Sequence, residues 1–251
     1  MEFTNEPGAL SIYRYRIMPH WFETMEEHLW LLPDEEGEEG ARFIKKALRL
    51  RKGQAVLDAP CGAGRIAFHL ACQGCAVTGV DLRPQFVNRA RRRFRKGGVQ
   101  GRFKVMDLRR LEFEQEFDGI FNWGGSFGYF SERENLELLR RYARALRPGG
   151  RVLVDQVYRE YILRHFAPEK LRGEVIVRNY WDKDTQRIIS RRIVNRRNDP
   201  KNMSSMRLYT FRETKELFEQ AGLVVEAFYG SFQGEKFRRS SPHLIAVGRK
   251  P

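Results

Sequence analysis

The sequence QAVLDAPCGAGRIAFHLACQGCAVTGVD, residues 54–81, contains the pattern from which the fold class follows. The run 54–58 is short and apolar, and a glycine turn follows it. The stretch 65–73 has the apolar spacing of a helix, and 76–80 is a second apolar run that leads directly to Asp81. A strand, a helix and a second strand in this order predict a βαβ unit with two parallel strands.

The same alternation continues along the chain. Ser131 with Glu134, and Thr210 with Glu213, have the spacing of helix capping boxes. We therefore expect helices at 40–50, 85–96, 132–146 and 211–221, and further strands at 102–105, 117–122, 151–156, 223–229 and 243–249. Such an alternation predicts one α/β domain with a mostly parallel sheet.

The pattern changes before the last helix. Residues 174–181 and 187–196 are rich in β-forming side chains and alternate in part, and 182–185 has the composition of a turn between them. Residues 207–209 supply a third short run. These segments predict a small antiparallel β insertion in the α/β pattern.

Composition sets the class of protein. The 251 residues, of which 41% are hydrophobic and 31% charged, suit a globular domain with its own core. Three cysteines, Cys61, Cys72 and Cys75, are odd in number, which argues against a disulfide framework and favours a reducing compartment. Cys72-x-x-Cys75 lacks two further ligands at similar spacing, so we expect no metal site. No signal peptide and no membrane-spanning run stands out, so we expect a cytoplasmic protein without a membrane partner.

The formal net charge of the chain is +14. A field of that sign attracts polyanions, so a nucleic-acid partner stays open. The arginines are spread over many segments, among them 89–95, 140–147 and 191–197, and no RNP, KH or zinc-finger pattern is present. A solvated, arginine-rich surface is therefore the favoured interpretation.

Acidic and amide side chains stand where the expected parallel strands end. They are Asp58, Asp81, Asp107 and Asn122. The carboxyl ends of parallel strands share one edge of a sheet, where ligands bind. Asp81 can accept hydrogen bonds from both ribose hydroxyls of a nucleoside. Asp107 can accept from an adenine amino group while the Leu108 N–H donates to the ring. These residues together predict a nucleoside-binding site at this edge of the sheet.

The glycine turn admits an alternative, because Gly62-x-Gly64-x-x-Ala67 also fits the dinucleotide fingerprint of an NAD-binding protein. In a dinucleotide site the first glycine directly follows the strand, so that pyrophosphate reaches the helix N-terminus. Here Asp58 precedes the turn and would repel a phosphate. It suits a ligand with an ammonium group, and the glycines let the backbone approach that ligand closely.

Four successive motifs resemble those of class I methyltransferases that use S-adenosylmethionine (AdoMet). They are 56–64 (VLDAPCGAG), 79–81 (GVD), 106–107 (MD) and 146–150 (LRPGG). The resemblance implies a Rossmann-like seven-stranded, mostly parallel sheet with its last strand antiparallel, and AdoMet as cofactor. The cofactor-binding residues that it implies are Asp58, Ala59, Pro60, Gly62, Gly64, Asp81, Leu82, Asp107, Leu108 and Asn122.

Further segments resemble a bacterial-type small-molecule subgroup with a β-rich insertion before the sixth strand. They are 122–130 (NWGGSFGYF), 207–210 (RLYT) and 229–232 (YGSF). The subgroup implies an N-terminal cofactor-covering segment at 1–40, a methyltransferase core at 41–158 and 208–251, and a β-rich insertion at 159–207 that acts as a substrate lid.

The acceptor side of the site is expected among aromatic and polar residues near the fourth strand. The predicted pocket residues are Trp21, Trp123, Ser126, Phe127, Tyr129, Arg207 and Tyr209. Aromatic faces attract a sulfonium as they do other cations, although packing on the domain explains the N-terminal aromatics equally well. Arg207 fits an acidic acceptor or a structural salt bridge. No catalytic residue is assigned. The candidates by residue type alone are His20, His28, His69, His165 and His243, and a lone histidine is more often structural; His243 begins the last strand, near the loop 230–241, from which it could approach the pocket.

The favoured function is methyl transfer to an oxygen or nitrogen of a small-molecule acceptor. The alternative is an RNA or protein methyltransferase, which the +14 charge supports. The sequence 122–125, NWGG, stands where a base-methylating enzyme has an Asn/Asp-Pro-Pro-Tyr motif, which counts against that role. The acceptor molecule and the oligomeric state stay open.

Overall fold

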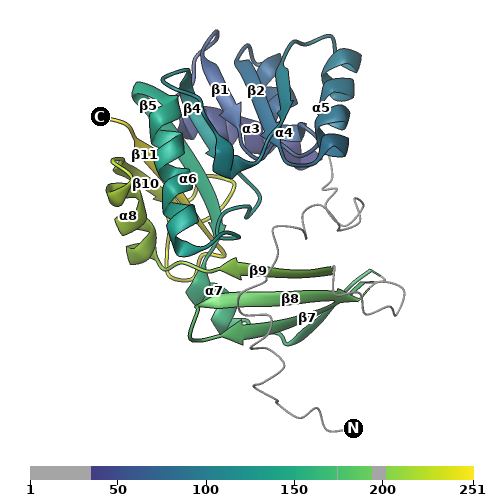
Figure 1. The fold of residues 1–251 in the computed structure, drawn as a ribbon, viewed down its shortest axis with the longest axis vertical. Helices are drawn as coiled ribbons and strands as arrows, with labels where there is room; N and C mark the ends of the chain where they lie inside the picture. The colour runs from purple at the N-terminus through teal and green to yellow at the C-terminus, as the bar shows by residue number, and fades with distance from the viewer. Residues whose placement is uncertain (1–34, 174, 194–201) are drawn as a thin grey trace, which may run out of the picture. The chain divides into compact units, whose positions relative to one another are not determined.

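The computed structural model describes residues 35–173, 175–193 and 202–251. The described chain divides into a larger unit, 35–166 with 206–251, and a smaller unit within 167–205. Figure 1 shows both units as ribbons.

A seven-stranded sheet forms the centre of the larger unit. Its strands are β1 (Ala55–Asp58), β2 (Ala76–Asp81), β3 (Arg102–Val105), β4 (Phe117–Asn122), β5 (Leu146–Val157), β10 (Val224–Tyr229) and β11 (His243–Arg249). They lie in the order β10-β11-β5-β4-β1-β2-β3. Pairing is antiparallel on both sides of β11 and parallel from β5 to β3, which confirms the predicted fold class.

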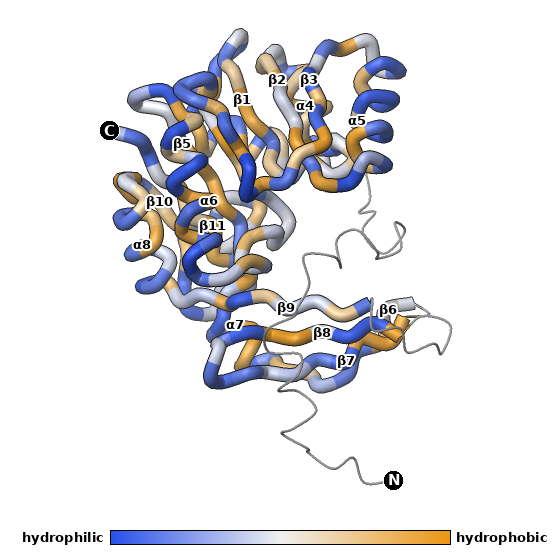
Figure 2. The backbone as a smooth tube through the Cα atoms, in the orientation of Figure 1, coloured by the Kyte–Doolittle hydropathy of each residue, from blue (hydrophilic) through white to orange (hydrophobic). Residues whose placement is uncertain are grey.

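Helices cover both faces of this sheet (Figure 1). They are α3 (Glu35–Ala47), α4 (Arg65–Cys72), α5 (Pro84–Lys96), α6 (Glu132–Ala145) and α8 (Phe211–Gln220). The short helix α7 (Arg159–Arg164) follows β5 and has no buried residue. One apolar core gathers side chains of α3, α4 and α5, and a second gathers those of α6 and α8. Figure 2 shows hydrophobic residues along the strands of this sheet, and hydrophobic and hydrophilic residues alternating along the helices, as amphipathic helices require.

The two predicted capping boxes are confirmed. The Ser131 hydroxyl accepts from the Glu134 N–H at 3.3 Å, and the Glu134 carboxylate accepts from the Ser131 N–H at 3.1 Å. Thr210 and Glu213 exchange the same bonds at 3.1 and 2.7 Å. Each box satisfies two N–H groups that a helix start leaves without partners.

Helix α3 includes Glu35, whereas the pattern predicted a start at about Gly40. Glycine in a helix interior is unfavourable, which is why the pattern predicted a later start. Here the glycines allow close packing: a Cβ on Gly37 would lie 2.7 Å from the Arg65 Cγ, and one on Gly40 would lie 2.7 Å from the Ile66 Cδ1. Contact between α3 and α4 therefore overrides the intrinsic preference.

The smaller unit is a four-stranded sheet in the order β6-β7-β8-β9. Its strands are β6 (Glu169–Arg172), β7 (Val175–Asp182), β8 (Arg187–Ile193) and β9 (Met203–Arg207). The predicted hairpin is the antiparallel pair β7–β8, and the Asp182 carboxylate accepts from the Asp184 N–H at 3.0 Å in its turn. The third strand lies earlier than the predicted 207–209, and β6 was not predicted, because neither has the apolar alternation of a half-buried strand.

Within the described residues, no helix is long and apolar enough to cross a membrane.

Candidate cofactor and acceptor site

The turn after β1 is tied to the end of β2 by a carboxylate. Asp81 accepts from the Gly62 N–H and from the Arg83 N–H, both at 2.9 Å. Burial raises the pKa of Asp81, although these hydrogen bonds and the Arg83 charge oppose the shift. Two backbone donors leave a carboxylate with lone pairs for further donors, so Asp81 retains the capacity to accept from ribose hydroxyls.

Asp58 lies beside this turn, at the end of β1, with 3% of its surface exposed. Burial raises the pKa of Asp58 well above its ordinary range, the negative charge of Asp81 adds to the shift, and Arg65 opposes it. A buried carboxylate with a like charge nearby gains most from a cation. The electrostatics therefore fit the ammonium group expected from the sequence.

The two glycines of the turn have different roles. Gly62 has φ +48°, and a Cβ built on it would meet no atom within 4 Å. Gly64 has φ +71°, and its Cβ would lie 2.8 Å from the Ala90 Cβ, so it permits contact between the start of α4 and the middle of α5. The space over Gly62 is available to a ligand, whereas Gly64 contributes through packing.

The base of the turn is held by a buried tyrosine. Tyr142, on α6, donates to the Ala59 carbonyl at 2.9 Å and accepts from the Asn122 side-chain amide at 3.1 Å. The Ala59 N–H donates to the Phe121 carbonyl at 3.0 Å. Ala59 thus contributes by its backbone, and the network fixes the turn against the end of β4.

Tyr142→Phe is expected to lower the free energy of unfolding by about 1–2 kcal/mol, because it leaves buried polar groups without partners. Urea denaturation measures this effect. Tyr180→Phe is the matched control, since Tyr180 is 46% exposed and its hydroxyl can bond to water. Equal stability of the two variants would contradict the role of the Tyr142 hydroxyl.

Asn122 is completely buried, and its side chain points toward Tyr142. Its Oδ1 has no hydrogen-bond partner among the described residues. The side chain therefore helps to hold the end of β4 against α6. Pro60 and Leu82 are half-buried at the two turns of the same edge.

Asp107 follows β3 and caps the short 3-10 helix Leu108–Arg110. Its carboxylate accepts from the Arg109 N–H at 2.9 Å and from the Arg109 guanidinium at 2.6–3.1 Å. Burial acts to raise the pKa of Asp107, but the Arg109 hydrogen bonds and charge outweigh it and hold that pKa below the ordinary value. An adenine amino group would share the carboxylate with Arg109, and Leu108 is buried beneath.

The predicted acceptor residues in the loop after β4 differ in their burial and contacts. Trp123 is half-buried and packs on Phe232 with ring centroids 4.4 Å apart, and the Ser126 hydroxyl donates to the Trp123 carbonyl at 3.1 Å. Phe127 is only 2% exposed and belongs to the core. Tyr129 is half-buried. Trp21 lies outside the described residues.

Arg207 and Tyr209 form a buried polar network with α6 and α8. Arg207 is 8% exposed and pairs with Glu132 and, at 2.6 Å, with Glu213. The Tyr209 hydroxyl donates to Glu132 at 3.1 Å and accepts from the Asn135 amide at 3.0 Å. Of the two roles expected for Arg207, the structure places it in the salt bridge, and Tyr209 in the core.

Arg207→Met is expected to destabilise the fold by about 2 kcal/mol, because it removes hydrogen bonds to charged groups while keeping side-chain volume. Thermal and urea unfolding report the loss. Arg212→Met is the control, since the Arg212–Glu216 pair lies on the exposed surface and contributes little. A stability like that of wild type in Arg207→Met would contradict the assignment.

One functional candidate, Asp155 on β5, was missed by the sequence reasoning. Its carboxylate is completely buried and accepts from the N–H groups of Gly124 and Gly125 at 3.0 and 3.1 Å. The sequence does contain one sign of this role, because Asp155 lies near the end of the predicted strand 151–156. That strand lies next to the fourth strand in the sheet. An acidic residue near the carboxyl end of that strand belongs to the same edge as Asp58.

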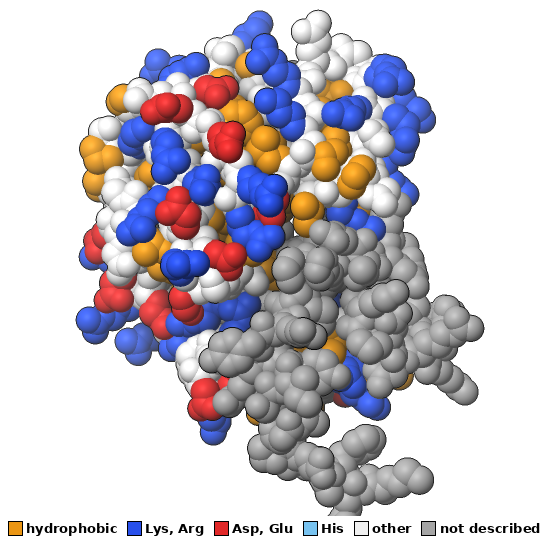
Figure 3. All heavy atoms as spheres, in the orientation of Figure 1, with side chains coloured by type: hydrophobic (Ala, Val, Ile, Leu, Met, Phe, Trp, Pro, Cys, Tyr) orange, Lys and Arg blue, Asp and Glu red, His pale blue; other side chains and the backbone are white. Residues whose placement is uncertain are grey.

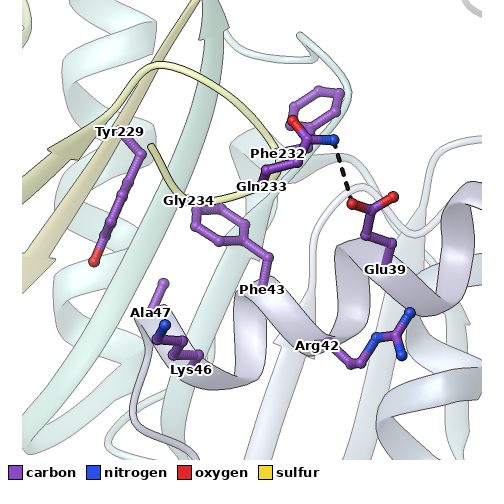
Figure 4. Close-up of a pocket in the computed structure, with 9 residues that line it drawn as sticks. All are labelled: Glu39, Arg42, Phe43, Lys46, Ala47, Tyr229, Phe232, Gln233 and Gly234. Carbon is purple, nitrogen blue, oxygen red and sulfur yellow. Dashed lines mark hydrogen bonds between the residues drawn. The ribbon is translucent and has the colours of Figure 1, made fainter. Parts of the chain in front are cut away.

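A hollow of about 270 Å³ lies between α3 and the turn after β10. Figure 4 shows its aromatic wall, made by Phe43, Tyr229 and Phe232, and the Gln233 amide that donates to Glu39 at 3.3 Å. Phe232 connects the hollow to Trp123. The sequence reasoning did not predict it, because its walls come from distant segments.

Comparison with known proteins shows similarity to methyltransferase domains. A family model described as a methyltransferase domain matches residues 56–150. The chain is 37% identical over 117 residues to an S-adenosyl-L-methionine-dependent Diels-Alderase from Talaromyces variabilis, covering 45% of the chain and 39% of the relative. It is 32% identical over 124 residues to the ubiquinone biosynthesis O-methyltransferase of Xanthomonas euvesicatoria, covering 47% and 48%. The chain thus spans less than half the length of these two relatives.

Similarity of fold extends over the whole chain. The structure of an AdoMet-bound amino pentose methyltransferase from Micromonospora echinaspora, CalS10, covers all of both chains with a TM-score of 0.63 at 18% identity. At that identity the match concerns the fold alone. Residues 56–150 are thus similar to a methyltransferase domain, and the motif order and the seven-stranded sheet agree with that similarity.

Proposed function

We propose that the chain transfers the methyl group of AdoMet to an oxygen or nitrogen of a small-molecule acceptor. The observation that carries the proposal is the buried pair Asp58 and Asp81 beside open space over Gly62. A phosphate-bearing dinucleotide would meet two carboxylates there, whereas a cationic nucleoside would find an ammonium acceptor and a ribose acceptor.

The residues of this edge would hold AdoMet in three ways. Asp58 would accept from the ammonium group, Asp81 from the ribose hydroxyls, and the backbone at Leu108 would donate to the adenine. Bound AdoMet supplies a sulfonium methyl group that is open to in-line displacement. The chain has to align the attacking atom with that methyl group and to exclude water.

A small acceptor is supported by the relatives and by the loop after β4. The curated O-methyltransferase relative and the amino pentose methyltransferase are both named for small molecules. Gly124 and Gly125 have positive φ, and a Cβ on either would meet nothing within 4 Å, so the loop offers room at the same edge. We further propose that the insertion at 159–207 and the segment 1–40 complete the pocket as lid and cover.

Two measurements test the proposal. Calorimetric titration with AdoMet and with NAD should give binding of AdoMet only; binding of NAD alone would contradict it. Transfer of tritiated methyl from AdoMet should then be found with hydroxyl and amine probes such as catechol and an amino sugar. Binding of AdoMet with no transfer to any probe would point to a reaction of another kind, as in the Diels-Alderase relative.

An RNA acceptor is the second candidate, and one observation favours it. The segment 84–106 contains eight lysines and arginines and no acidic residue. Figure 3 shows basic side chains over much of the visible face, with few acidic ones among them at the right edge, where α5 lies. Transfer to total RNA that falls steeply with salt, without transfer to the small probes, would favour this candidate.

A further inference from the structure

We infer that His243, oriented by Asp155, is the general base that takes the proton from the acceptor's hydroxyl or ammonium group. This role rests on the proposed function and fills the catalytic position that the sequence left unassigned. It depends on three features of the larger unit: a buried carboxylate, the orientation of an imidazole ring, and the edge of the sheet at which both lie.

Asp155 joins three segments at one point. One carboxylate oxygen accepts from the Gly124 and Gly125 N–H groups, and the other lies 3.0 Å from the His243 Nδ1. The carboxylate has no exposed surface, so its position is fixed by these bonds. The same residue therefore holds both the loop after β4 and the ring at the start of β11.

The bond to Asp155 also fixes the tautomer of the ring. A carboxylate oxygen accepts, so Nδ1 carries the hydrogen, and in the neutral ring Nε2 keeps its lone pair. The side chain of His243 is 27% exposed, and the ring of Phe232 packs against it with 4.2 Å between ring centroids. The imidazole thus has a carboxylate on one nitrogen and an apolar ring beside it, while part of its surface stays open.

His243 lies at the edge that carries the cofactor candidates. β11 runs antiparallel to β5, so its first residue lies opposite Val157 at the carboxyl end of β5. The neighbouring strands β4 and β1 end at the same edge, at Asn122 and Asp58. The ring is therefore held near the Gly124–Gly125 loop, because both are bonded to the same Asp155 carboxylate.

The chemical step balances with these groups alone. Nε2 of His243 takes the proton of the acceptor O–H while the oxygen forms a bond to the methyl carbon. The carbon–sulfur bond breaks, and its electron pair stays on sulfur as a neutral thioether. The imidazolium is stabilised by the Asp155 carboxylate until it loses the proton to water.

The test uses a variant that keeps the structural bond and removes the base. His243→Asn retains an N–H that can donate to Asp155, but it has no basic nitrogen. With catechol as the probe acceptor, kcat should fall about 100-fold or more, with the catechol KM and the AdoMet Kd within about two-fold of wild type. Imidazole in solution should restore part of the activity of His243→Ala. Unchanged kcat in His243→Asn would overturn the inference.

A second measurement needs no acceptor. Long-range ¹H–¹⁵N correlation spectra should show His243 protonated at Nδ1 and unprotonated at Nε2 when neutral, and its ring signals should shift when S-adenosylhomocysteine binds. His69 on α4 serves as the internal reference, with no comparable shift. Protonation of the neutral His243 ring at Nε2, or ring signals that do not shift when S-adenosylhomocysteine binds, would overturn the inference. A protein that binds AdoMet but methylates no probe would count against the proposed function, and the spectra would still decide the role of His243.

Discussion

Asp58→Asn is expected to weaken AdoMet binding by about 100-fold, which is about 2.7 kcal/mol, because it replaces the carboxylate that pairs with the ammonium group by an uncharged amide. The buried position of Asp58 makes the charge effective. Calorimetric titration gives the affinity. Glu114→Gln, an equal change of charge at an exposed position, is the control and should bind as wild type does.

The same substitution should not destabilise the free protein at neutral pH. The pKa of Asp58 is raised in the folded state, mainly by burial, so the folded chain holds more protons than the unfolded chain between about pH 3.9 and that raised pKa. The free energy of unfolding therefore falls as pH rises through this window. Above the window the carboxylate is ionised in the folded chain, and the full desolvation cost of burying its charge lowers the stability. A neutral amide at this position lacks this cost, so the Tm of Asp58→Asn should equal or exceed that of wild type.

AdoMet binding should have the opposite dependence on pH. The ammonium group pairs with the ionised carboxylate, so affinity should rise as pH rises through the raised pKa of Asp58. Asp58→Asn should flatten this profile. An Asp58→Asn protein that binds AdoMet as tightly as wild type at neutral pH would contradict the ammonium assignment.

Gly62→Val is expected to abolish AdoMet binding, with a loss of about 1,000-fold or more. The valine side chain would enter the space over the turn, where a Cβ meets no protein atom within 4 Å. The φ of +48° adds strain of about 1–2 kcal/mol for a residue with a Cβ, so the fold should survive with a lower Tm.

The control for this variant is Gly53→Val. Gly53 has φ +84° and open space around its Cβ, but it lies in the turn before β1, at the other end of that strand. Both variants have similar strain, and only Gly62→Val fills the ligand space. Equal AdoMet affinity in the two variants would show that the cofactor does not pass over Gly62.

The layout of the larger unit was predictable because its signals are local. Apolar runs such as 117–122, and capping boxes such as Ser131 with Glu134, depend on residues close in the sequence. The order of acidic strand ends is also local, and a parallel sheet brings such ends to one edge. This is why the pairing of Asp58 with Asp81 could be predicted from the sequence.

The roles of single side chains depend on partners distant in sequence or on contacts that residue type does not reveal. Tyr209 was expected in the pocket, but its hydroxyl is bound by Glu132 and Asn135 on α6. Asp107 was expected to be available to adenine, but Arg109, two residues away, reaches its carboxylate. Aromatic and acidic types fit a pocket or a core equally well until these contacts are known.

The role of Asp155 could not be predicted from the sequence either, because its partners are distant along the chain. Nothing near it in sequence connects it to Gly124, which is 31 residues earlier, or to His243, which is 88 residues later. Only the strand order β11-β5-β4 brings them together. A candidate base could therefore be assigned once the topology was known.

A crystal structure of the chain with bound AdoMet would locate the cofactor without any inference from affinity. We predict the ammonium group within hydrogen-bond distance of the Asp58 carboxylate, the ribose hydroxyls at Asp81, and the methionine portion over Gly62. An AdoMet molecule bound elsewhere, with Asp58 and Asp81 free of contact, would contradict the assignment of this edge as the cofactor site.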